Sequence, residues 1–327
     1  MDAIFRFCCK TLLITATLAI AGVAGAAPYP EPGKTIKFII GFPAGSTIDN
    51  VSRIVLDNIR ERTGTPIVID NRPGALGSLG VQALAKMPAD GYALGPSSSA
   101  THSSGPYLSK HAAQLDALRD FTHIGRFVRF DVVIVTRSAS AHTTAATLIS
   151  DARAKPGLLS YGYGSGTGQV VAAAFTRTAG IKLLGVPYKG QPPALADLIG
   201  GHVDFVAADL GAVLPFVRAR QLAAIALTSR QRSSILPDVP TAQELGLSGL
   251  DLSGWIGVAG PRGLPADVIA WWEDQLQQSL AAADVVERLR TMGIEPDPLI
   301  GAPFQTFVRE QREDWGRQIR QAGIEAQ

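Results

Sequence analysis

The stretch SYGYGSGTGQVVAAAF, residues 160–175, joins a strand-like start, a run of glycines and an apolar, helix-like end. Gly162, Gly164, Gly166 and Gly168 occupy every second position, and the glycines stop where the alanine- and valine-rich run begins. A glycine inside regular structure costs roughly 0.5–1 kcal/mol relative to alanine, so this segment needs bare backbone. The pattern predicts a strand, a glycine-rich loop and a helix in direct succession.

The loop that joins a parallel strand to the next helix lines the ligand crevice of an α/β sheet. The first N–H groups of a helix lack intrahelical partners, and the helix dipole adds partial positive charge there. We therefore expect this loop to hold an anion, with the hydroxyls of Ser165 and Thr167 as further donors. The loop has neither the lysine of an ATPase phosphate loop nor the G-x-G-x-x-G spacing of a dinucleotide site, so a carboxylate fits better.

A second loop, which follows the first apolar strand of the chain, repeats this pattern. The segment GFPAGSTIDN (41–50) places Gly45, Ser46 and Thr47 ahead of a helix that opens at Asp49. Two such loops, one from each half of the protein, would hold an anionic ligand from both sides. Glycine–serine loops before helices also merely turn the chain and cap the helix, and this alternative stays open.

Strand-like and helix-like segments alternate along the chain, which is typical of an α/β fold with mostly parallel sheets. Two extended runs, at 127–137 and 250–261, bracket the middle of the chain. We expect two doubly wound domains around a central ligand cleft. Domain 1 would consist of residues 27–130 plus 250–327, and domain 2 of residues 131–249, so that the chain crosses between them twice.

Residues 1–26 have the pattern of a secretory signal peptide, with a positive start, a short apolar run and an A-x-A site that ends at Ala26. We expect cleavage near Ala26 and a mature protein in the periplasm. Both cysteines, Cys8 and Cys9, lie in this segment, so the mature chain would lack disulfides and cysteine sites. The whole chain has 30 Lys and Arg against 28 Asp and Glu, which gives no bias toward nucleic acid.

The chain resembles the Bug family of periplasmic solute receptors, the TctC-like substrate-binding component of tripartite tricarboxylate transporters. The resemblance covers essentially the whole mature chain. It rests on the order of the segments YPEPGKTIKFIIGFPAGSTID, VIDNRPGALGSLG, PADGYAL, SATHSSGPYL, KPGLLSYGYGSGTGQ, VPYKGQPPALADLIGGHVD and ILPDVPTAQELG. It implies a type II periplasmic-binding-protein fold and a carboxylate that the two loops hold through backbone groups and bridging water.

The loops and the resemblance together define a candidate ligand-binding set. The set comprises Phe42, Gly45, Ser46, Thr47, Asp49, Ser98, Ser99, Thr101, His102, Ser165, Gly166, Thr167, Gly168, Gln169, Tyr188 and Asp209. We expect the ligand carboxylate at the N-terminus of a helix that starts near Gly168, bound by the N–H groups of residues 166–168 and the Thr167 hydroxyl. Ser46 and Thr47 would approach it from the other domain, and Phe42 would form a wall of the pocket.

By resemblance, Tyr188 and Asp209 lie toward the end of the cleft that sets specificity. An ionised Asp209 would repel a second carboxylate unless it met an amino or hydroxyl group. This argues for a ligand with one donor-bearing end. The candidates are a mono- or dicarboxylate, an aromatic acid or an acidic amino acid.

The chain departs from the family pattern at two places. Gly45-Ser46-Thr47-Ile48-Asp49 stands where the family has a glycine run followed by Thr-Asp. Gly95-Pro96 interrupts the apolar run of the third strand, and proline cannot donate to a sheet ladder. The positions of Ser98, Ser99, Thr101 and His102 relative to the ligand are therefore open.

Three classes of function fit these features. A transport receptor would deliver its ligand to membrane transporter subunits, whereas a ligand sensor would keep the same pocket and dock on a signalling partner. A serine hydrolase built from Ser99, His102, Ser165 and Asp209 is the third. The sequence has no G-x-S-x-G elbow, and its five histidines lack metal-ligand spacing. We therefore expect a monomeric receptor and not an enzyme, with no cofactor, metal or nucleic acid.

Overall fold

The computed structural model describes residues 28–326 except 111–114, 230, 248–249 and 251. The predicted signal peptide therefore lies outside the described residues. Pro32–Gln327 forms one compact unit, to which all the elements below belong.

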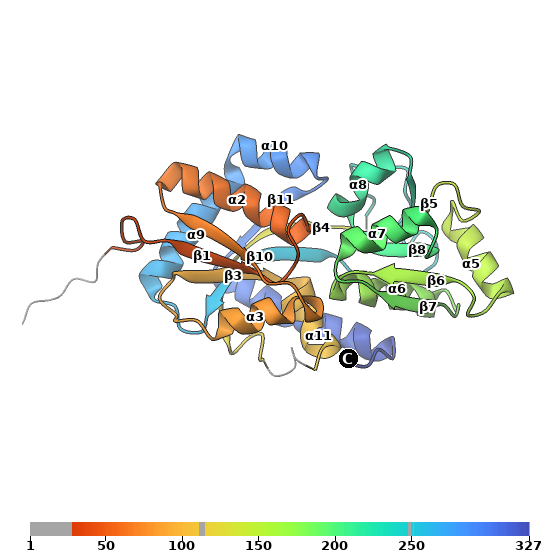
Figure 1. Cartoon of the computed structure of the whole chain (residues 1–327), viewed down its shortest axis with the longest axis horizontal. Coiled ribbons are helices and arrows are strands. Elements are labelled where there is room, and N and C mark those ends of the chain that lie inside the picture. Colours follow the sequence, from red (N-terminus) through yellow and green to blue (C-terminus); the bar gives the residue numbers. More distant parts are fainter. Residues whose placement is uncertain (1–27, 111–114, 230, 248–249, 251, 327) are drawn as a thin grey trace, which may run out of the picture. The chain divides into compact units, whose positions relative to one another are not determined.

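Two mixed sheets form the centre of this unit (Figure 1). The first has the strand order β11-β4-β10-β3-β1-β2 and the second the order β7-β6-β8-β5-β9. The first sheet comprises β1 (Ile36–Ile40), β2 (Ile67–Asn71), β3 (Ala93–Ser98), β4 (Phe121–Phe130), β10 (Gly254–Pro261) and β11 (Glu295–Ile300). The second comprises β5 (Val132–Arg137), β6 (Ser160–Tyr163), β7 (Leu184–Pro187), β8 (Phe205–Asp209) and β9 (Leu222–Leu227).

The expectation of mostly parallel sheets is wrong. Strands β1, β2 and β3 pair in parallel, as do β6, β7 and β8. The pairs made by β10 and β4, and those that β5 makes with β8 and β9, are antiparallel. Each antiparallel pair includes β4, β5 or β10, which are the strands next to the crossings between the sheets. Strand β4 passes directly into β5, and the chain returns through β10. The fold class is a mixed α/β fold with two sheets.

The chain changes sheet at two places in the sequence. Only Asp131 separates the end of β4 from the start of β5, and the return runs from the end of β9, Leu227, to the start of β10, Gly254. The strands of the second sheet are therefore inserted as one block between those of the first.

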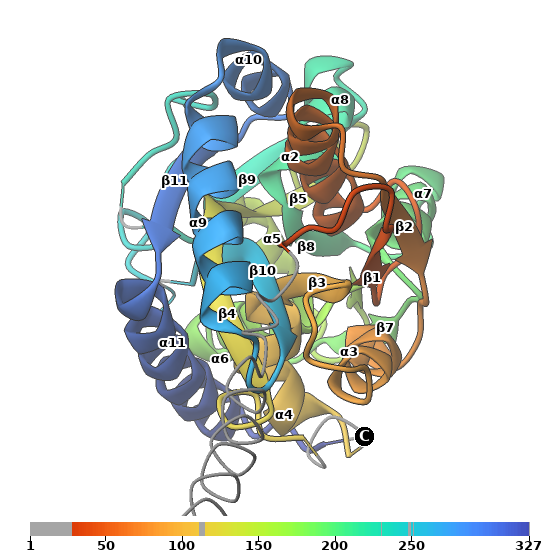
Figure 2. The same cartoon turned by 90° about the vertical axis from the view of Figure 1, so that its left-hand side faces the viewer.

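Helices cover both faces of each sheet. Around the first sheet lie α2 (Thr47–Thr63), α3 (Ser78–Ala85), α4 (Gly105–Leu108), α9 (Ala266–Ala281), α10 (Ala283–Thr291) and α11 (Ala302–Gln321), with two short turns, η1 (Ala75–Gly77) and the π-helical η2 (Ser99–Ser104). Around the second lie α5 (Ala145–Ala154), α6 (Gly166–Thr178), α7 (Gln191–Gly200) and α8 (Leu210–Arg218). Helices α2, α9 and α10 pack together on one side of the first sheet, opposite α3 (Figure 2).

Strand β5 shows why the second sheet is covered on both faces. Val132 and Ile134 belong to the apolar cluster that includes α5 and α6, whereas Val133 and Val135 belong to the cluster that includes α7 and α8. Since successive side chains of a strand point to opposite faces, an unbroken apolar run predicts this double burial. The glycine-rich segment thus enters a helix that packs firmly on its own sheet.

Helix α11 packs against elements of both sheets. Its residues Trp315 and Ile319 are buried in the same cluster as Phe175 of α6 and Val132 of β5. The helix also packs on η2 and β4. The position of α6 relative to η2, on which the site depends, is therefore set in part by α11.

Strand β3 continues through Gly95-Pro96, which interrupt the apolar run of the sequence but not the strand. All of its residues are buried. β3 pairs with β1 only at Ala93 and Leu94, and from Gly95 to Ser98 it pairs with β10. Because the ladder to β1 has already ended at Pro96, the missing N–H costs no hydrogen bond on that side.

Candidate functional site

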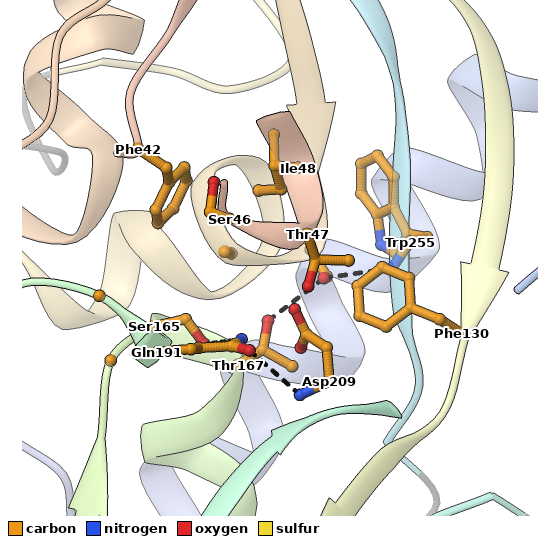
Figure 3. A pocket seen from close by; sticks show the side chains of 14 residues that line it. Phe42, Ser46, Thr47, Ile48, Phe130, Ser165, Thr167, Gln191, Asp209 and Trp255 are labelled. Carbon is orange, nitrogen blue, oxygen red and sulfur yellow. Dashed lines mark hydrogen bonds between the residues drawn. The ribbon is translucent and has the colours of Figure 1, made fainter. Parts of the chain in front are cut away.

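A small cavity lies where the starts of α2 and α6 come close to β4, β10 and the end of β8 (Figure 3). Its lining consists of Phe42, Ser46, Thr47, Ile48, Ser99, Ala100, Phe130, Gly164, Ser165, Thr167, Gly190, Gln191, Asp209 and Trp255. The space open to the centre of a water-sized sphere is about 20 Å³. This is room for about one water molecule.

Helix α6 begins at Gly166, two residues before the predicted start near Gly168. Ser165 is its N-cap, and the Ser165 Oγ accepts a hydrogen bond from the Gly168 N–H at 3.0 Å. The Gly168 N–H is therefore committed to the cap. The N–H groups of Gly166 and Thr167 precede it and have no acceptor within the helix, which leaves them for a ligand.

The glycines before α6 pack against other backbone. A Cβ at Gly164 would lie 2.1 Å from the carbonyl carbon and oxygen of Gly190, and one at Gly168 would lie 2.5 Å from the Ala207 carbonyl oxygen. Real Cβ atoms do not approach so closely, so both positions require glycine. The bare backbone thus serves the contact with the start of α7 and with β8, a reason that the sequence interpretation did not include.

Helix α2 begins in the same manner, with Ser46 as the N-cap. Its Oγ accepts from the Asp49 N–H at 3.4 Å, and the buried Asp49 carboxylate accepts from the Gly45 N–H at 2.9 Å. Arg53 and Asn71 also donate to this carboxylate, at 2.8 and 2.9 Å. Burial raises the pKa of Asp49, but the hydrogen bonds outweigh this effect and hold the pKa below its ordinary value. Asp49 therefore stabilises the loop, and it does not line the cavity.

One buried donor of the lining, the Trp255 Nε1, has no hydrogen-bond partner among the described residues. The Thr47 hydroxyl lies beside the Asp209 carboxyl, whose pKa it lowers. Leaving a buried polar group without a partner costs about 1–3 kcal/mol. Folded proteins leave few such groups, and donors of this kind at a cavity indicate a ligand or a bound water.

Asp209 is the only lining residue with an ionisable side chain. It occupies the N-cap position of α8 without a side-chain capping hydrogen bond, and it is 5% exposed. Its backbone N–H donates to the Gln191 Oε1 at 3.4 Å. Burial raises the pKa of Asp209 to about 6, against the opposing effect of the Gln191 and Thr47 side chains close by. The cavity therefore offers donors and one acid but no basic side chain.

A hydroxyl pair joins the two halves of the site. The Ser99 Oγ, in the first turn of η2, lies 3.2 Å from the Thr167 Oγ1 of α6. The same Ser99 Oγ accepts a hydrogen bond from the backbone N–H of Trp255, on β10, at 3.3 Å. A hydroxyl of η2 and a hydroxyl of α6 thus meet at the start of α6.

Seven of the predicted residues line the cavity: Phe42, Ser46, Thr47, Ser99, Ser165, Thr167 and Asp209. The other nine, which do not line it, are Gly45, Asp49, Ser98, Thr101, His102, Gly166, Gly168, Gln169 and Tyr188. The Tyr188 hydroxyl donates to the Asp197 Oδ2 at 2.7 Å, within its own half. His102 is fully buried, and its Nδ1 lies 2.9 Å from the Thr101 Oγ1. No histidine therefore stands among the lining residues.

The remaining lining residues escaped the sequence interpretation. Ile48, Ala100 and Gly164 neighbour predicted residues, and Gly190 and Gln191 lie in the segment VPYKGQPP, so extending each loop by one or two positions would have found them. Phe130 and Trp255 stand at the two crossings between the sheets, where no sequence pattern shows which way an apolar side chain points.

Two further findings concern the described part of the chain. None of its helices is both long enough and apolar enough to span a membrane. None of its His, Cys, Asp and Glu side chains gather in a group of three or more that could hold a metal ion.

Two mixed β-sheets with helices on their faces, joined by two crossings, form the fold of known periplasmic solute-binding proteins. The structure of R. palustris Rpa4515 with adipate matches with a TM-score of 0.85 at 29% identity, over 90% of this chain and 99% of that one. MatC (Rpa3494) from Rhodopseudomonas palustris with bound malate matches with a TM-score of 0.80 at 26% identity, over 88% and 99%.

The sequence comparisons identify the family. A profile of the tripartite tricarboxylate transporter family receptor, TctC, matches residues 51–324. Protein BugT of Bordetella pertussis is 30% identical over 315 residues, which are 95% of each chain. The chain therefore belongs to the TctC family of tripartite tricarboxylate transporter receptors.

Proposed function

We propose that this protein captures a small carboxylate in the cavity between its sheets and delivers it to a tripartite tricarboxylate-type membrane transporter. The observation that carries the proposal is the arrangement of two helix N-termini, of α2 and α6, at one buried cavity. Helix N-termini favour anions through their free N–H groups and their dipoles. The adipate and malate in the two related structures are consistent with a carboxylate.

The anchor for the carboxylate is the start of α6. The N–H groups of Gly166 and Thr167 and the Thr167 hydroxyl supply the donors, with the Ser99 hydroxyl beside them. Trp255 supplies a buried indole N–H without a partner among the described residues, and the Thr47 hydroxyl lies beside Asp209. This set binds an anion without a lysine or arginine, because its donors are fixed dipoles in a nearly dry cavity.

Ligand entry requires the protein to open. A cavity of about 20 Å³ holds no adipate- or malate-sized molecule. In the proposal, residues 27–130 plus 250–327 and residues 131–249 are two domains that rotate about the two crossings, at Asp131 and before Gly254. The ligand binds to one domain in the open form, and the other domain closes on it.

The cellular setting completes the proposal. The signal-peptide pattern of residues 1–26 and the membership of a transporter receptor family support export to the periplasm. The partner is then the membrane part of the transporter, and the receptor itself does no chemistry on its ligand.

A thermal-shift screen tests the function. It compares mono-, di- and tricarboxylates, aromatic acids and acidic amino acids with uncharged sugars and with cations. Because a ligand that binds only the folded state stabilises it, at least one carboxylate should raise the melting temperature in proportion to the logarithm of its concentration. A melting temperature that responds only to sugars or to cations would refute the proposal.

A further inference from the structure

The large apolar side chains of the cavity all come from one half of the fold, and this division deepens the proposed function, on which the inference rests. Among the described lining residues, the segments around the second sheet contribute two glycines and four polar side chains: Ser165, Thr167, Gln191 and Asp209. The apolar side chains larger than alanine come from the segments around the first sheet: Phe42, Ile48, Phe130 and Trp255. In Figure 3, the four polar side chains lie together in the lower part of the view.

The polar side chains form one connected surface at the start of α6. The Gln191 Nε2 donates to the Ser165 Oγ at 3.5 Å, and the Gln191 Oε1 accepts from the backbone N–H of Asp209 at 3.4 Å. Because Ser165 is the N-cap of α6, this surface adjoins the N–H groups that are left for a ligand carboxylate. The carboxylate therefore belongs on the polar surface, and the rest of the ligand meets the apolar one.

Three aromatic rings, of Phe42, Phe130 and Trp255, form most of the apolar surface. The Phe42 ring packs on Gly77, where a Cβ would lie 2.7 Å from it, and the Phe130 ring packs on Gly254, where a Cβ would lie 2.1 Å from it. Trp255 is fully buried. The rings are thus held in place by the fold and present a fixed apolar surface to a ligand.

The described residues of the lining include no lysine, arginine or histidine. A second ligand carboxylate against the aromatic rings would lose its hydration without gaining a charge partner, and burying such a charge is costly. An uncharged apolar body would instead gain free energy from the area that it buries there. The lining therefore suits a ligand with one carboxylate and an apolar body.

We propose that the ligand is a small aromatic monocarboxylate, with its carboxylate at the start of α6 and its ring against Phe42, Phe130 and Trp255. Aromatic rings pack edge-to-face or offset with their centroids about 4.5–7 Å apart, and such pairs gain more than their buried area alone provides. The indole N–H of Trp255, which has no partner among the described residues, can donate to the π-face of an aromatic ring but not to a saturated body.

Calorimetric titration of the wild-type protein with three matched ligand pairs tests the proposal. The pairs are hexanoate with adipate, 4-nitrobenzoate with terephthalate, and benzoate with cyclohexanecarboxylate, all at neutral pH. The first two pairs add a second carboxylate at nearly constant size, and each dicarboxylate should bind at least about a hundredfold more weakly. Benzoate should bind roughly two- to tenfold more tightly than its saturated partner. Both members of a pair carry the same first carboxylate, so the effect of Asp209 on that group cancels.

The variant Phe42→Leu and a matched control assign the preference to the aromatic surface. Leucine keeps an apolar side chain and removes the ring, so the ratio of benzoate affinity to cyclohexanecarboxylate affinity should fall by about twofold or more. Phe216→Leu makes the same change on α8, outside the lining of this cavity, and should keep the wild-type ratio.

The outcomes separate this proposal from the proposed function. If the dicarboxylates bind as tightly as their matched monocarboxylates, or cyclohexanecarboxylate binds as tightly as benzoate, the ligand class is refuted and the receptor function stands. The same holds if none of the six compounds binds while another carboxylate does. If no carboxylate of any kind binds, the proposed function itself fails. Since the three pairs use wild-type protein, the test holds even if Phe42→Leu does not fold.

Discussion

The Thr167 Oγ1 and the Ser99 Oγ lie 3.2 Å apart, although the two residues stand 68 positions apart in the chain and belong to different halves of the fold. Ser99 follows strand β3 of the first sheet, and Thr167 lies in the first turn of α6 over the second. This hydroxyl pair closes the cavity from both sides at the predicted carboxylate anchor.

Replacing Thr167 with valine tests that anchor. The change keeps the shape of the side chain and removes a hydroxyl that we expect to donate to the carboxylate, at a cost of about 1–3 kcal/mol of binding. Calorimetric titration with the best carboxylate of the screen measures this loss. Thr176→Val on the same helix is the control, because the Thr176 hydroxyl bonds to the Ala173 carbonyl and does not line the cavity. Equal affinity in both variants would place the anchor elsewhere.

Trp255→Phe separates binding from folding. The phenylalanine keeps most of the buried ring and removes the Nε1 donor that has no partner among the described residues. We expect weaker carboxylate binding and a melting temperature of the free protein close to the wild-type value, since no hydrogen bond is lost. Trp315→Phe is the control, because the Trp315 Nε1 does not line the cavity and donates to the Gln311 Oε1 at 3.3 Å. This variant should bind the carboxylate like the wild type but have a lower melting temperature, since it loses a hydrogen bond. Unchanged affinity in Trp255→Phe would mean that its indole does not contact the ligand.

Gly164→Ala should lower the stability of the folded protein at the site. A Cβ at this position would lie 2.1 Å from Gly190 backbone, which cannot move as a side chain would. We expect a loss of roughly 2–4 kcal/mol in the free energy of unfolding, within the range of severe single substitutions. Urea denaturation measures it. At Gly162 a Cβ would come no closer than 3.1 Å, to the ring of Tyr188, so Gly162→Ala should cost clearly less. A similar cost for both would contradict the account of the close backbone contact.

Asp209→Asn should stabilise the protein at neutral pH. The folded-state pKa of Asp209, about 6, lies above its ordinary value of 3.8, so the folded protein holds the proton more tightly than the unfolded chain. The resulting destabilisation is absent below pH 3.8, grows as the pH rises to about 6 and then stays constant at roughly 2–3 kcal/mol. Urea denaturation of wild type and variant should thus give equal stabilities near pH 4 and a more stable variant at pH 8. A variant that is less stable at pH 8 would show that the ionised carboxyl is stabilised in the fold.

Part of the site could be predicted because helix starts leave a local signature. Serine at an N-cap, glycines before it and an apolar run after it identified the loops of Ser46 and Ser165, which both line the cavity. The two sheet crossings likewise follow from two long extended runs in the sequence.

The rest depends on contacts between distant segments. The Tyr188 hydroxyl donates a hydrogen bond to Asp197, because α7 brings that carboxylate close to it. The residues next to Tyr188 in the sequence give no sign of this contact. The Phe130 ring packs directly on Gly254, where a Cβ would lie 2.1 Å from the ring. This contact arises from the pairing of β4 with β10, which the sequence does not show. The antiparallel pairing of β4, β5 and β10 is equally non-local, so the alternation of strands and helices wrongly suggested mostly parallel sheets.

A crystal structure with the tightest-binding carboxylate tests the central claim most directly. The account predicts a closed protein with a ligand carboxylate oxygen about 2.7–3.2 Å from the backbone nitrogen of Gly166 or Thr167. It also predicts a second contact from Thr47 or Trp255, on the other side of the cavity. A carboxylate bound outside this cavity, or one that has no contact with the start of α6, would contradict it.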